Sequence, residues 1–111
     1  ELTELAPDEI LFSTILANAL ENALNAQSGQ SKEKGSQRGD IRLLLKDSSG
    51  KTLLCVKNTF HEAPLFRNGI PASFREGHGY GVQSILYITE KLGGNCQFTI
   101  EDDWFVLRVV V

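Results

Sequence analysis

The sequence has few of the residues from which metal sites and disulfide frameworks are built. Its 111 residues include two Cys and two His, with no CxxC or HxxxH spacing, so no zinc site is predicted. Cys55 and Cys96 each lie in an apolar run, which favours two small buried side chains over a disulfide. The chain also has no Met and begins at Glu1. We therefore expect it to be a fragment of a longer protein.

Long hydrophobic runs and an excess of positive charge are absent as well. No stretch approaches the roughly 20 apolar residues of a membrane-spanning helix, and no signal-peptide pattern opens the chain. The net charge of -3 and the pI near 5.3 argue against a dedicated nucleic-acid-binding protein. We therefore expect no nucleic acid and no membrane contact for this fragment. Its length fits a single domain over residues 1–111.

The first structural signal is an amphipathic period after Pro7. Asp8 can cap a helix there, and the helix should end near Ser28, before a polar, glycine-punctuated link over 27–40. The apolar residues that recur at the helical spacing are Ile10, Leu11, Ile15, Leu16, Ala19, Leu20, Ala23 and Leu24.

Two hairpins and a second helix follow. The runs 41–46 and 52–57 predict an antiparallel pair, and 95–100 and 104–111 predict another, each joined by residues typical of turns. Between them a helical period starts at Val82 and stops at Gly93-Gly94. The stretch from Thr59 to Gly77 has no period, and we expect a mobile lid at about 59–76.

This order predicts an α+β fold. Helix, hairpin, long loop, helix and hairpin together favour a two-layer α/β sandwich, with a mixed, mostly antiparallel sheet and the helices on one face. No internal repeat and no coiled-coil heptad is present.

Three amides share one stripe of the first helix. Asn18, Asn22 and Asn25 stand at i, i+4 and i+7, although Asn is a mediocre helix former. Burying an unpaired amide costs about 1–3 kcal/mol, so the repetition suggests a polar ligand. The alternative is that these side chains face solvent or cap neighbouring loops.

A glycine-rich segment opens the second helix. Gly77-His-Gly-Tyr-Gly-Val82 lets backbone N–H groups approach an anion where the helix N-terminus contributes positive partial charge. No Gly-Lys-Ser/Thr follows, and no βαβ unit surrounds it, so the Walker and Rossmann interpretations are set aside.

Together these two motifs resemble those of a known superfamily. Residues 15–26 (Ile-Leu-Ala-Asn-Ala-Leu-Glu-Asn-Ala-Leu-Asn-Ala) resemble the N box of the GHKL ATPases, which share the Bergerat ATP-binding fold. Residues 77–82 resemble their last glycine box. Residues 83–94 look like the helix and Gly-Gly turn of sensor histidine kinases, in particular the quorum-sensing-type branch. The resemblance spans nearly the whole chain.

The resemblance implies ATP and Mg²⁺ as ligands and assigns roles on the first helix. Asn22 would be the Mg²⁺ ligand, Asn18 would support the phosphates, and Glu21 would orient or deprotonate the attacking group. Asn25 lies where other histidine kinases place a basic residue near the phosphates. Positive charge next to the phosphates would then come from Lys57, Arg67 or Arg75.

It also assigns the glycine box and the adenine site. Gly77, Gly79 and Gly81 would wrap the phosphates, flanked by His78 and Tyr80, with His78 a neutral lid residue rather than a catalytic one. The superfamily usually carries an Asp-x-Gly-x-Gly loop, where the Asp binds the adenine amino group. This chain has Val-Lys-Asn-Thr-Phe over 56–60, so Asn58 would accept from the adenine amine without the charge that strengthens such a bond.

The function that the resemblance implies is phosphoryl transfer from Mg·ATP to a histidine. Neither His61 nor His78 lies on a long helix, so the phosphoacceptor helix would precede Glu1, and this fragment should bind ATP without autophosphorylating. The full-length kinase would serve a response regulator, with this part cytoplasmic in a membrane-anchored receptor. The alternatives are a GHKL serine kinase of the anti-sigma type, a pseudo-kinase or interaction module that has lost ATP binding, and an unrelated α+β domain.

Overall fold

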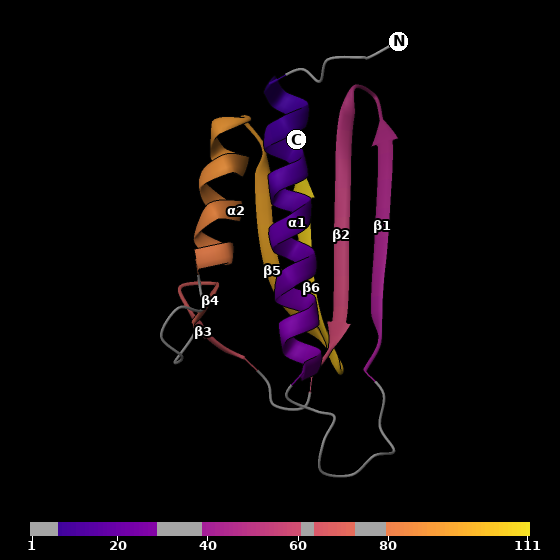
Figure 1. The fold of residues 1–111 in the computed structure, drawn as a ribbon, viewed down its shortest axis with the longest axis vertical. Coiled ribbons are helices and arrows are strands. Elements are labelled where there is room, and N and C mark those ends of the chain that lie inside the picture. Colours follow the sequence, from indigo (N-terminus) through magenta and orange to yellow (C-terminus); the bar gives the residue numbers. More distant parts are fainter. Residues whose placement is uncertain (1–6, 29–38, 61–63, 73–79) are drawn as a thin grey trace.

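The computed structural model describes residues 7–28, 39–60, 64–72 and 80–111. Two helices and two antiparallel sheets make up this part of the chain (Figure 1). In chain order the elements are α1 (Pro7–Ser28), β1 (Ile41–Ser48), β2 (Lys51–Thr59), β3 (Leu65–Arg67), β4 (Ile70–Ala72), α2 (Tyr80–Lys91), β5 (Asn95–Glu101) and β6 (Trp104–Val110).

The long helix α1 follows the predicted period and starts one residue earlier than expected. Pro7 is its first residue, where the missing N–H costs nothing because that position has no intrahelical acceptor. Asp8 is therefore not the cap. It lies with Glu9 in the first turn, where carboxylates interact favourably with the helix dipole. The helix ends at Ser28, as predicted.

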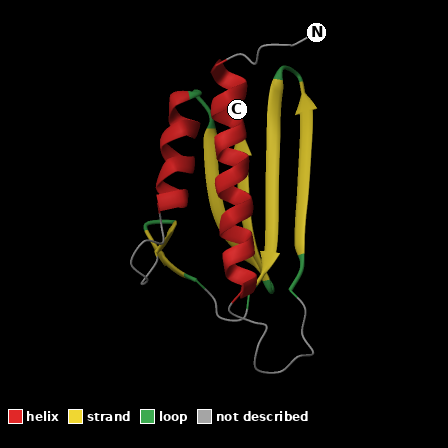
Figure 2. Cartoon of the chain, viewed as in Figure 1, coloured by secondary structure: helices red, strands yellow, loops and turns green. Residues whose placement is uncertain are grey.

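The main sheet has four strands in the order β1-β2-β6-β5, and every neighbouring pair is antiparallel. Both helices lie on one face of this sheet, with α1 over its middle and α2 beside it (Figures 1 and 2). The predicted two-layer α+β sandwich with helices on one face is confirmed.

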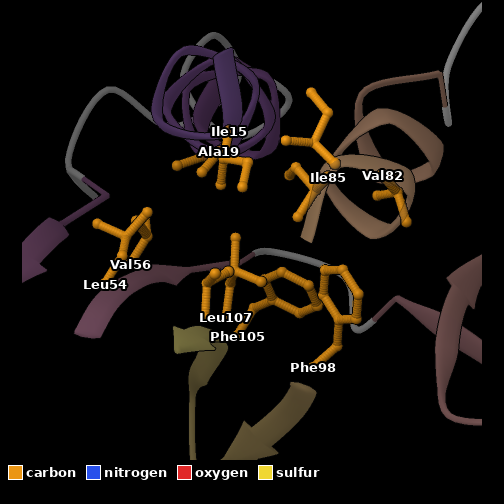
Figure 3. Packing of buried hydrophobic residues seen from close by; sticks show 12 residues of the cluster. Ile15, Ala19, Leu54, Val56, Val82, Ile85, Phe98, Phe105 and Leu107 are labelled. Carbon is orange, nitrogen blue, oxygen red and sulfur yellow. The ribbon is translucent and has the colours of Figure 1, made fainter. Parts of the chain in front are cut away.

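The core lies between the helices and the sheet. Ile15 and Ala19 of α1 and Ile85 of α2 point down at the sheet, and Phe105 and Leu107 of β6 point up to meet them (Figure 3). The small Ala residues let α1 approach the sheet closely, while Ile10 and Leu24 at the edges of the predicted stripe remain 52% and 60% exposed. The buried hydrophobic cluster is Ile15, Ala19, Ala23, Leu54, Val56, Val82, Ile85, Ile88, Phe98, Phe105, Leu107 and Val109.

The end of α2 explains the Gly-Gly pair. Gly93 has φ 73°, and its N–H donates to Glu90 O, while the Gly94 N–H donates to Thr89 O, both at 2.9 Å. This is the paired hydrogen-bond pattern of a Schellman cap, in which a glycine in the left-handed region ends the helix. Gly94 also passes so close to Val110 O that any side chain there would meet that carbonyl. The pair therefore ends α2 and permits contact with β6.

The stretch from Thr59 to Gly77 differs from the expectation. β2 continues to Thr59, and β3 and β4 form a small hairpin around Asn68 and Gly69, whose φ values are 55° and 77°. Two consecutive positive φ values are the signature of a type I′ turn, which suits Asn-Gly. The expected absence of regular structure is thus wrong for this hairpin, while residues 61–63 and 73–76 of the expected lid lie outside the described residues.

The two cysteines are free thiols on opposite faces of the main sheet. Cys96 pairs with the helix-facing Val109, and Cys55 pairs with Arg108 on the other face. Burial raises the pKa of the Cys96 thiol from 9.0 to about 11. Within the part of the chain that the structure describes, neither helix is long and apolar enough to cross a membrane.

Candidate nucleotide-binding site

The first helix and the glycine-led helix meet at Asn18 and Gly81. A Cβ placed on Gly81 would lie 3.7 Å from Asn18 Oδ1 and 3.8 Å from Asn18 O. Gly81 is the second residue of α2, so the first turn of this helix, with N–H groups that lack intrahelical acceptors, starts beside the Asn18 amide. The structure thus brings one member of the amide motif, Asn18, next to one member of the glycine motif, Gly81.

The other amides of α1 lie on the same flank as Asn18 but differ in exposure. Asn22 is half-buried and one turn further along the helix, whereas Asn25 and Glu21 are exposed. On this flank the Asn18 and Asn22 amides are partly enclosed, whereas the Glu21 carboxylate faces solvent. A ligand seated against Asn18 and Asn22 would have Glu21 at its open side.

Asn58 occupies a buried position on the helix-facing side of β2. Its exposed fraction is 2%, and its Nδ2 donates to Thr59 O at 3.0 Å. Because the amide nitrogen is used in this bond, Oδ1 is the atom that a ligand's donor would meet. In Figure 1 the ends of β2 and α1 lie low in the view, and α2 starts higher, beside the middle of α1.

Aromatic rings lie next to Asn58, and the sequence analysis missed them. Phe105 is the cross-strand partner of Asn58. Its ring centroid is 6.2 Å from that of Phe66 on β3 and 6.0 Å from that of Phe98 on β5, within the range of favourable aromatic pairs. Phe66 reaches this cluster only because the β3–β4 hairpin exists, with Ile70 also packed against the core. The hairpin thus adds Phe66 to the aromatic cluster around Phe105, the cross-strand partner of Asn58.

Of the three predicted sources of phosphate charge, the structure contradicts one and leaves the other two as predictions. Lys57 faces away from the helices, and its Nζ lies 5.1 Å from the centre of the Trp104 ring on the opposite side of the sheet. The suggestion that Lys57 neutralises the phosphates is therefore wrong, because alternate β2 residues point to opposite faces. Arg67 is exposed on β3, and Arg75 lies outside the described residues.

Most of the glycine box cannot be placed. Gly77, His78 and Gly79 lie outside the described residues, and Tyr80 is described only as the first residue of α2. Gly81 is the member of the box with a described contact.

Solved structures with the same fold are catalytic domains of histidine kinases. The nucleotide-free catalytic domain of the histidine kinase ThkA matches with a TM-score of 0.70 and 19% identity, over 92% of this chain and 67% of that one. Acinetobacter baumannii histidine kinase AdeS matches with a TM-score of 0.63 and 14% identity, over 91% and 45%. The histidine kinase domain of the blue-light-activated kinase from Erythrobacter litoralis matches with 0.64 and 13%, over 91% and 42%. The fold is that of a histidine kinase ATPase domain.

The chain belongs to the GHKL domain family, whose model matches residues 8–111. The predicted superfamily is confirmed, and ATP binding is consistent with it. A comparison with curated proteins gives no match. The chain spans 66% of the length of another ThkA catalytic-domain structure and less than half of the longer kinases. The quorum-sensing-type branch stays a prediction.

Proposed function

We propose that this chain is the Mg·ATP-binding catalytic domain of a two-component sensor histidine kinase. The observation that carries this proposal is the contact between Asn18 and Gly81, because it joins an amide-bearing helix to the start of a glycine-led helix. Such a junction offers an amide, backbone N–H groups and the positive end of a helix to a phosphate chain. A side chain at Gly81 would occupy this space.

Asn22 is the proposed Mg²⁺ ligand. Among the described residues no cluster of three or more His, Cys, Asp or Glu could hold a metal ion. The Asn22 amide oxygen would act together with phosphate oxygens and water, the ligands that Mg²⁺ accepts. When bound, the ion would neutralise charge on the phosphates. The half-buried Asn22 would hold the ion beside Asn18, and Glu21, exposed at the rim, would orient the acceptor group.

Asn58 and its aromatic neighbours form the proposed adenine site. The Asn58 Oδ1 can accept a hydrogen bond from the exocyclic amine, while Phe66, which packs on the buried Phe105 and is itself 36% exposed, provides an apolar surface for the base. Guanine presents an oxygen at the equivalent position, which Asn58 Oδ1 cannot donate to. The site should therefore prefer ATP to GTP.

The γ-phosphate acceptor would be a histidine on a dimerisation helix outside residues 1–111. The full-length kinase would then pass the phosphoryl group to a response regulator. This domain would belong to the cytoplasmic part of a membrane-anchored receptor.

A neutral Asn58 in place of the usual Asp favours one second candidate, a pseudo-kinase or interaction module with the same fold. A serine kinase of the anti-sigma type is distinguished by the acid stability of phosphoserine, which phosphohistidine lacks.

Calorimetric titration with ATP and Mg²⁺ tests the proposal. We expect Asn22→Ala to weaken Mg·ATP binding by at least about tenfold, the size of one lost charge-assisted contact, and to remove most of the Mg²⁺ dependence. Asn95→Ala, at an exposed Asn on β5, is the matched control and should bind like the parent.

No Mg·ATP binding by the folded parent domain would favour the pseudo-kinase. If the parent binds ATP, the acceptor helix supplied in trans should become labelled on an acid-labile histidine, and an acid-stable label would identify the serine kinase instead.

A further inference from the structure

The face of the main sheet that is turned away from the helices carries a concentration of cations. Leu54, Val56 and Asn58 of β2 are buried under the helices, so the alternate residues of β2 and their cross-strand partners point to the opposite side. We call this side the open face. Its basic residues are Arg42, Lys46, Lys51, Lys57 and Arg108.

Trp104 lies at one end of the open face, where it is the cross-strand partner of Glu101, and two basic side chains reach its ring. The Arg42 guanidinium carbon is 4.9 Å and the Lys57 Nζ is 5.1 Å from the centre of this one ring. Cations at such distances are attracted to the negative face of an aromatic ring. Two long side chains are thereby held in position over a half-buried tryptophan, which reduces the entropy that they would lose on binding a partner.

Basic side chains outnumber carboxylates among the described residues of the open face. Arg42 and Lys57 are direct cross-strand partners, an arrangement of like charges that disfavours the strand pair. Arg108 is paired with Glu101 at 3.0 Å, and Asp40 lies just before β1. Glu101 is also the cross-strand partner of Trp104, and Asp40 is hydrogen-bonded to Thr59 beside it. Both carboxylates therefore lie at the Trp104 end of the face, and an anion bound next to Arg42 and Lys57 would relieve the repulsion between these two cations.

We infer that the open face docks an acidic segment of a partner protein, with Trp104, Arg42 and Lys57 as the centre of the interface. Trp and Arg are the side chains most enriched among residues that dominate binding energy. A chain of net charge -3 favours a short acidic segment over a long polyanion such as nucleic acid. Among the described large apolar side chains that are exposed, Leu44 alone lies on this face, which is too little for insertion into a lipid surface.

This surface is independent of the proposed nucleotide site, because the sheet separates the two. A partner bound to the open face would leave the junction of Asn18 and Gly81 accessible. The interface would therefore allow the domain to be recruited or positioned by another protein while nucleotide is bound.

Trp104 provides the assay, because it is the single tryptophan of the chain. Its fluorescence is followed as the intact 111-residue chain is titrated with a synthetic peptide of alternating Glu and Thr, and separately with the corresponding Lys–Thr peptide, oligothymidylate and phosphatidylglycerol vesicles. We expect saturable binding of the acidic peptide that weakens as salt is added. In the double variant Arg42→Gln/Lys57→Gln the affinity should fall by about three- to thirtyfold.

Lys91→Gln is the matched control, because Lys91 also lies over an aromatic ring, at 5.9 Å from the centre of Tyr87, but on α2. It should bind the peptide like the parent. The charge-conserving double variant Arg42→Lys/Lys57→Arg should retain binding, which separates loss of charge from loss of fold, and ATP titrations on the same samples should be unchanged.

Absence of acidic-peptide binding by the parent, or equal affinity in the charge-removing double variant, overturns the inference. Tighter binding of oligothymidylate or of the vesicles overturns it in favour of a nucleic acid or an anionic lipid surface. A parent that binds the peptide but not ATP supports this interface while refuting the proposed nucleotide site.

Discussion

Replacing Gly81 with Ala should change stability and ATP binding in opposite directions. The new Cβ would meet Asn18 at 3.7–3.9 Å, ordinary van der Waals contact that requires no movement. Gly within a helix is less favourable than Ala by about 0.5–1 kcal/mol. The free energy of unfolding should therefore stay unchanged or rise by up to about 1 kcal/mol, which corresponds to a few degrees in Tm. The methyl group would, however, fill the space beside the Asn18 amide.

We expect Gly81→Ala to lower ATP affinity by about ten- to a hundredfold, the range for hydrogen bonds to a charged group. Denaturant unfolding without nucleotide and calorimetry with Mg·ATP measure the two effects separately. Gly50→Ala is the control, because it should lower stability and leave ATP affinity unchanged. Gly50 has φ 78° and no atom within 4 Å of a new Cβ, so this variant should lose about 1–2 kcal/mol of stability from the left-handed backbone and keep its ATP affinity. Unchanged ATP binding in Gly81→Ala, or a loss of more than about 1 kcal/mol of stability, would refute the reasoning.

Two further predictions concern the end of α2 and the buried thiol. Gly94→Ala should lower the free energy of unfolding by about 1–3 kcal/mol or more, because the Cβ would meet the Val110 carbonyl oxygen and lie 2.6 Å from Val111 Cγ1; a Tm equal to that of the parent would contradict this. Since burial raises the pKa of Cys96 from 9.0 to about 11, the native chain keeps its proton where the unfolded chain loses it, and stability should fall as pH rises through that interval. Cys96→Ala should show a smaller loss over the same interval in denaturant unfolding, and an identical pH dependence would show that Cys96 is not responsible.

The elements with long periodic patterns could be predicted from the sequence. In α1 the apolar positions repeat over several turns, and the turn around Gly50 and the glycine pair after α2 each need a backbone that few residues adopt. These signals are local, so they can be recognised without knowledge of the tertiary structure. The superfamily motifs added the expectation that the first helix and the glycine-led helix share one nucleotide site.

The β3–β4 hairpin was missed although its turn carries a clear signal. Asn68-Gly69 is the preferred pair for a type I′ turn, but the flanking strands have three residues each and β4 contains Pro71, which is unusual inside a strand. The hairpin depends on packing of Phe66 against Phe105, residues far apart in the chain. Such a contact cannot be inferred from local pattern.

The wrong role for Lys57 has a different origin. It was named because Asn25 stands where other histidine kinases have a basic residue, but it directly precedes Asn58 on β2, and neighbouring strand residues point to opposite faces. The burial of Asn58 under the helices therefore places Lys57 on the open face. In contrast, the junction of Asn18 and Gly81 could be expected only through the superfamily resemblance, because it depends on how α1 and α2 pack.

The strand order has a consequence for how this domain is made. β6, the last described strand along the chain, lies inside the sheet between β2 and β5, and it supplies Phe105, Leu107 and Val109 to the core. During synthesis, α1 and the first hairpin leave the ribosome well before their central partner exists. The apolar faces of these early segments therefore lack their β6 partner until residues 104–110 have been made, and the early strands are exposed to aggregation until then.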